Sequence, residues 1–67
     1  MWLFTKPDDK REPVVLVMGS RREARLKLVK IVAGHGMIGS WTEAKLSNAD
    51  RRKMLKKFEV DTLYTIG

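Results

Sequence analysis

A short apolar run, Val14 to Met18, limits what this chain can fold into more than any other part of it. The run is rich in β-branched valine and is ended at once by Gly19 and Ser20, which is typical of a buried strand. Residues 21–33 then follow without a glycine or a proline. Because Ser20 is a suitable N-cap and Gly34 a suitable terminator, this second stretch predicts a helix.

The predicted helix has one broad apolar side. At 100° per residue, Leu28, Val29 and Ile31 fall on the same face, together with Ala24 and Val32. Leu26 falls on the opposite, polar side. We therefore expect this helix to cover the strand that precedes it, with Leu26 outside the core.

Length and composition limit how the domain is stabilised. The chain has 67 residues and no cysteine, so disulfides and thiolate zinc sites are excluded. Hydrophobic residues make up 43% and charged residues 33%, a balance typical of folded domains. A chain of this size holds one small core. We expect a single domain over residues 1–67, with no metal ion and no cofactor.

Two further segments predict strands that could pair beside the apolar run. Residues Trp2–Thr5 either form a hairpin with it or fray as a terminus. Residues Val60–Ile66 alternate and are rich in β-branched residues, so they predict a closing strand. The glycine-rich stretch 34–40 predicts a loop, with Met37 and Ile38 tucked into the core.

Residues 41–58 predict two short helices. Ser40-Trp41-Thr42-Glu43 and Ser47-Asn48-Ala49-Asp50 both match a capping box, and a break near Ser47 keeps polar residues out of the apolar stripe. The expected fold class is therefore α+β, with two or three helices packed on a small sheet of two or three strands.

The charge of the chain is concentrated. The formal net charge is +6, and the excess comes from two segments that both predict helices, residues 21–33 and 47–58. Charge held on helices is organised into surfaces, which favours a polyanionic partner. We expect both basic segments to share one solvent-facing surface, and the polyanion hypothesis depends on this.

Residues 41–58 also have the proportions of a helix-turn-helix, in which the second helix enters the major groove of duplex DNA rather than RNA. Asn48, Arg51 and Arg52 are then candidates for contacts with base edges, because asparagine pairs with adenine and arginine with guanine. The expected phosphate contacts are Lys45, Lys53, Lys56 and Lys57, joined by Arg21 and Arg22 at the start of the first helix. An ordinary solvated helix face is the alternative interpretation of the same charges.

Other functions stay open or are disfavoured. Trp2, Leu3 and Phe4 could form an exposed patch that mediates a homodimer or docks on a larger acidic protein, or they could belong to an edge strand. Binding of a basic helix to an anionic membrane surface is a third hypothesis. No apolar stretch approaches the ~20 residues that span a bilayer, and no signal peptide is visible, so we expect a cytoplasmic protein.

Catalysis is not expected. The serines at positions 20, 40 and 47 match helix caps, and His35, between two glycines, has no carboxylate nearby in sequence to orient it. We predict no catalytic residues. The chain is expected to act by binding, as a small regulatory or accessory protein.

Overall fold

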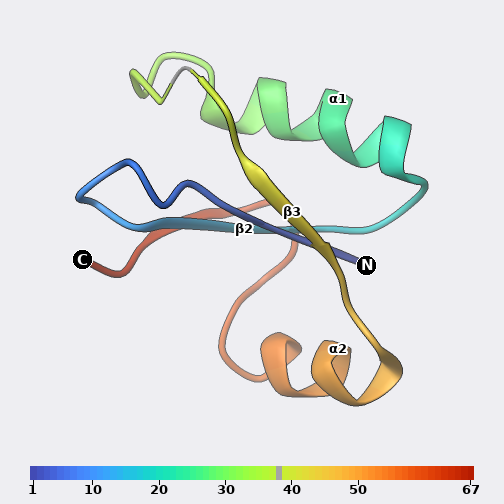
Figure 1. Cartoon of the computed structure of the whole chain (residues 1–67). Helices are drawn as coiled ribbons and strands as arrows, with labels where there is room; N and C mark the ends of the chain where they lie inside the picture. The colour runs from blue at the N-terminus through green and yellow to red at the C-terminus, as the bar shows by residue number, and fades with distance from the viewer. Residues whose placement is uncertain (38) are drawn as a thin grey trace.

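The chain folds as a four-stranded sheet with two helices (Figure 1). The computed structural model describes residues 1–37 and 39–67, so the prediction for Ile38 lies outside the described residues. In chain order the elements are β1 (Trp2–Thr5), β2 (Pro13–Val17), α1 (Arg21–Val32), β3 (Thr42–Lys45), α2 (Asn48–Leu55) and β4 (Leu63–Thr65). The strands lie in the order β3-β1-β2-β4, and every neighbouring pair is antiparallel. The α+β class and the pairing of the first and last strands with the apolar run are confirmed.

The prediction of a helix over residues 41–47 is wrong. Residues Thr42–Lys45 form an edge strand that pairs with β1, with Ala44 opposite Leu3 and Thr42 opposite Thr5. The physical reason is that β1 has β2 on one side only, and its other row of backbone donors and acceptors needs a partner. This pairing overrides the local helical preference of the segment. The sheet thereby gains a fourth strand, and the helix-turn-helix does not form.

The main core lies between the sheet and α1. Phe4, Val15 and Val17 project from β1 and β2 onto one face, where Ala24 and Leu28 of α1 cover them, and all five side chains are buried. Partly buried hydrophobic residues close the rim of this cluster: Trp2, Ile31, Val32, Trp41 and Leu63. Met37 is also buried, as predicted.

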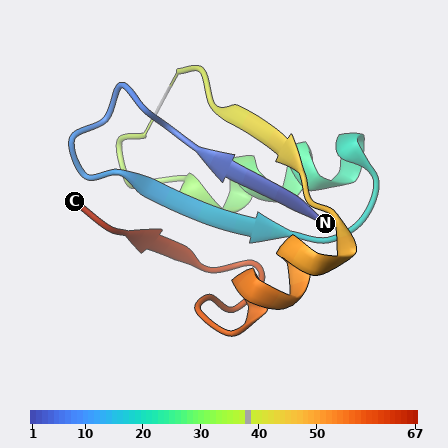
Figure 2. The same cartoon turned by 60° about the horizontal axis from the view of Figure 1, so that its bottom comes forward.

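The second face of the sheet has its own cover. Leu16 projects to this face and is fully buried, with Leu3 opposite it on β1. The chain after α2 returns beneath this face, where the Phe58 ring lies 5.0 Å from that of Tyr64 and Val60 forms a bridge to Leu16. Figures 1 and 2 show α1 and α2 on opposite sides of the sheet. A strand with a continuous apolar run has two apolar faces, so each of them requires a cover.

Both helices begin at the predicted caps. The Ser20 hydroxyl accepts from the Glu23 backbone N–H at 3.3 Å, and the Ser47 hydroxyl accepts from that of Asp50 at 3.2 Å. Each bond satisfies one of the free donors at a helix start. Within the described residues, neither helix has the length and apolar character needed to cross a membrane.

Candidate nucleic-acid interface

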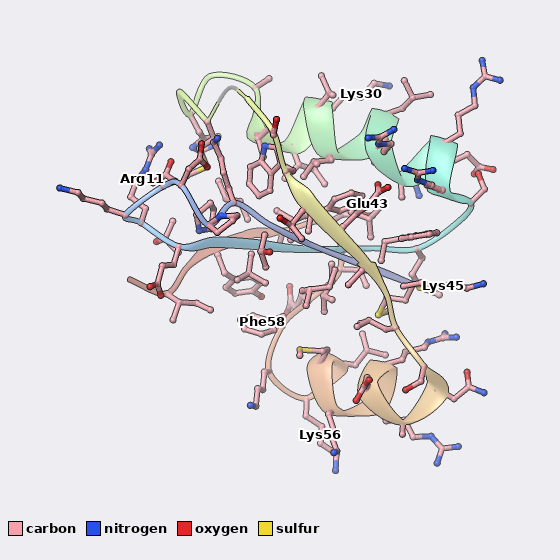
Figure 3. The ribbon with its side chains drawn as sticks, in the orientation of Figure 1. Arg11, Lys30, Glu43, Lys45, Lys56 and Phe58 are labelled. Atoms are coloured by element: carbon pink, nitrogen blue, oxygen red, sulfur yellow. The ribbon has the colours of Figure 1, made fainter. Side chains whose placement is uncertain are left out.

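The two basic segments do not share a surface, which corrects the expectation drawn from their charge. Lys30 of α1 points away from the sheet on one side, and Lys56 beyond α2 points away on the other (Figure 3). The cause is the fold itself, because one helix covers each face of the sheet. A polyanion that contacts one basic helix therefore does not reach the outer face of the other. The hypothesis of a single polyanion-binding surface built from both helices is wrong, and only binding through one helix is left to propose.

On the α1 side, part of the positive charge is neutralised within the fold. Glu43 projects from β3 toward α1 (Figure 3) and forms ion pairs with Arg21 and Arg25, with the Arg25 Nε 3.3 Å from Oε2. The glutamate side chain is only 17% exposed, whereas both arginines are well exposed. Arg21, predicted as a phosphate contact, thus already has an anionic partner. The sequence assigns Glu43 to a helix cap, so its pairing with these arginines is not predicted.

The start of α1 is also occupied. The Ser20 hydroxyl donates to the Glu23 carboxylate at 3.1 Å, so a side chain of the helix itself supplies the negative charge there. The free phosphate site expected at this helix terminus is therefore filled by the chain. Arg22, the other arginine assigned to it, is exposed and belongs to none of the ion pairs among the described residues.

The α2 side is different, because none of its cations has an acidic partner within the described residues. Across residues 1–37 and 39–67, the ion pairs involve only Lys6, Arg11, Arg21 and Arg25. The unpaired and exposed cations of α2 and of the turn after it are Arg51, Arg52, Lys53, Lys56 and Lys57. Asp50 in the first turn is the only acidic residue of the helix.

The predicted base-contacting residues are brought together. Asn48, Arg51, Arg52 and Leu55 line one shallow depression of about 360 Å³. Asn48 and Arg52 are also four residues apart, with Lys56 four further on, so the three follow one line along the outer face. Lys45 lies at the end of β3 and points away from the molecule (Figure 3), close in sequence to the start of α2.

The expected docking patch at Trp2, Leu3 and Phe4 does not exist as a free segment, which is a second correction. These residues form β1, an inner strand of the sheet, and Phe4 is 1% exposed. The Trp2 indole N–H donates to the Gly19 carbonyl at 3.2 Å. The apolar start of the chain is thus part of the core, because it supplies alternate residues to both faces of the sheet.

The residues considered for chemistry have structural positions. His35 lies in the exposed turn after α1, where its backbone carbonyl accepts from the Arg11 guanidinium at 3.0 Å. Ser20 and Ser47 act as helix caps. In the described part of the chain, no three side chains of histidine, cysteine, aspartate or glutamate are grouped so that they could hold a metal ion.

Comparisons with known proteins add no relative. No family model, no curated protein and no solved structure matches the chain.

Proposed function

We propose that this protein binds nucleic acid through α2, with duplex DNA as the preferred form, and acts in the cytoplasm as a small regulatory or accessory factor without enzymatic activity. The observation that carries the proposal is the set of exposed cations on α2 and the turn after it, none of which forms an ion pair within the described part of the chain. Such a face neutralises phosphates and releases their counterions, which is the main source of sequence-independent affinity.

The dimensions of α2 favour DNA over RNA. An α-helix with its side chains is about 10–12 Å in diameter, which matches the width of about 12 Å of the major groove of B-DNA. The major groove of A-form RNA is too narrow for side chains to enter. Asn48, Arg51 and Arg52 lie within the first five residues of α2, where they would face base edges, while Lys53, Lys56 and Lys57 would contact phosphates.

The size of the cationic face limits the expected affinity. The three phosphate contacts of Lys53, Lys56 and Lys57 would give a slope of about −2.7 in a plot of log K against log salt. Binding of this type is weak, with a Kd of about 10⁻⁴ to 10⁻⁶ M at physiological salt. A homodimer that presents two α2 helices would double the contact area.

A pair of double variants tests the proposal, because the chain offers a matched control on its other face. Lys53→Gln with Lys56→Gln removes two charges from α2, and Lys27→Gln with Lys30→Gln removes two from α1. All four residues are exposed, so both variants should keep the stability of the wild type. Affinity for a random-sequence DNA duplex is measured by fluorescence anisotropy at several salt concentrations.

We expect the α2 variant to lose about two units of salt slope and the α1 variant to retain the slope of the wild type. Equal losses in the two variants would show that net charge, rather than α2, determines binding. No measurable binding of the wild type at low salt would refute the nucleic-acid proposal.

A further inference from the structure

The outward face of α1 carries hydrophobic residues that the fold does not use. Leu26 is 60% exposed and Val29 is 65% exposed. The sequence places Leu26 on the polar side, as observed, but it places Val29 in the core, which is wrong. Ala24, Leu28 and Ile31 suffice to cover the sheet, and Val29 lies too far around the helix to reach it.

These residues form a line suited to another helix. Arg22, Leu26, Val29 and Ala33 follow one another at intervals of four, three and four residues, the spacing of a coiled-coil seam. All four are exposed. We name this line the α1 seam. Its three apolar members, Leu26, Val29 and Ala33, make no favourable contact with a phosphate backbone.

We propose that the α1 seam docks an acidic amphipathic helix of a partner protein. The charges around the seam determine the occupant. Arg22 lies within it, and Arg25, Lys30 and Glu23 lie beside it, all of them exposed. Arg25 is already paired with Glu43, so Arg22 and Lys30 are the cations left for a partner. A second copy of this chain would bring like charges together, which is unfavourable. A helix with leucines facing Leu26 and Val29 and with glutamates at its flanks complements both the apolar and the cationic residues.

A membrane surface fits the α1 seam less well than a protein does. An interfacial helix buries a broad apolar face that is rich in large side chains, whereas the seam offers one leucine and one valine. Arg25 is also held near β3 by its ion pair with Glu43, which keeps that flank of the seam in a fixed position. The seam is small against the ~800 Å² per partner of a stable interface, so the docking is transient and of modest affinity.

The test uses the whole protein and a synthetic probe. The probe is a helical peptide with leucine at its seam positions and glutamate at the flanking positions, and a peptide of the same composition in scrambled order is the control. Binding is measured by isothermal calorimetry and mapped by NMR amide shifts. The variant Leu26→Ser removes an exposed side chain that the fold does not need, and Leu55→Ser, at an exposed leucine of α2, is the matched control.

We expect saturable binding of the probe, shifts confined to α1, and a loss of at least about fivefold in affinity with Leu26→Ser, because Leu26 is the largest apolar side chain of the seam and a few such central residues dominate the affinity of an interface. Leu55→Ser should bind as the wild type does. Equal binding of the scrambled peptide, shifts on α2, or no saturable binding would overturn the proposal. If the protein dimerises and Leu26→Ser abolishes the dimer, the seam binds a second copy instead. If the protein binds anionic phosphatidylserine vesicles through Leu26 and does not bind the peptide, the seam binds lipid. None of these outcomes depends on whether α2 binds DNA.

Discussion

Two leucines of α1 differ only in the direction they face, and this provides a quantitative test of the fold. Leu28 is 6% exposed, within the cluster that includes Phe4 and Val15, whereas Leu26 is 60% exposed. Truncating a buried leucine to alanine costs about 2–5 kcal/mol, because the transfer free energy is lost and a cavity remains. A chain of 67 residues has a total stability of about 3–10 kcal/mol. Leu28→Ala should therefore remove a large part of the free energy of unfolding.

The effect is measurable by urea and thermal unfolding. A loss of 3 kcal/mol corresponds to a fall in Tm of about 12–24 °C for a domain of this size. Trp2 and Trp41 pack against the same core, so their fluorescence reports its loss together with circular dichroism. Leu26→Ala is the control and should change the stability by no more than about 0.5 kcal/mol. Similar losses in the two variants would refute the assignment of the core to the Leu28 side of α1.

Three other predictions concern polar contacts. Hydrogen bonds from the Arg11 side chain and backbone lower the pKa of Asp9 from 3.8 to about 2. The stability that this shift contributes is complete above about pH 4 and is lost as the pH falls through about 2. Asp9→Asn should therefore flatten a plot of unfolding free energy against pH in that range. Ser47→Ala removes the cap of α2 and should cost about 0.5–2 kcal/mol of helix stability, seen as faster amide exchange in α2 but not in α1. Glu43→Gln leaves the two α1 arginines without their anion; a chemical-denaturation curve should show a loss of about 1 kcal/mol, and an unchanged curve would mean that the pairs contribute nothing.

Local signals in the sequence identify most of the elements. The run ended by Gly19 and Ser20 predicts β2 and the start of α1, and Ser47 predicts the start of α2. The segment Thr42–Lys45 is different, because its residues are compatible with a helix and the open edge of β1 decides the outcome. That edge exists only in the folded sheet, so no local signal reveals it.

The positions of the cations in space also depend on the folded sheet. The sequence identifies which residues are basic and which of them lie on helices, but it does not place the two helices relative to each other. One signal was present: Val14–Val17 is apolar at every position, and a strand of that kind is buried on both faces. It favours helices on both sides of the sheet. The pairing of Arg21 with Glu43, by contrast, depends on the strand β3 and was not predictable.

Among the residues that the structure describes, the buried cluster beneath α1 is formed by residues between Phe4 and Leu28. The first half of the chain therefore supplies most of the cooperative folding, and the second half adds one edge strand, one lightly packed helix and a short return strand. Substitutions on the outer surface of α2 should consequently change the free energy of unfolding very little. The recognition proposed for α2 can therefore change through such substitutions while the fold beneath it stays the same.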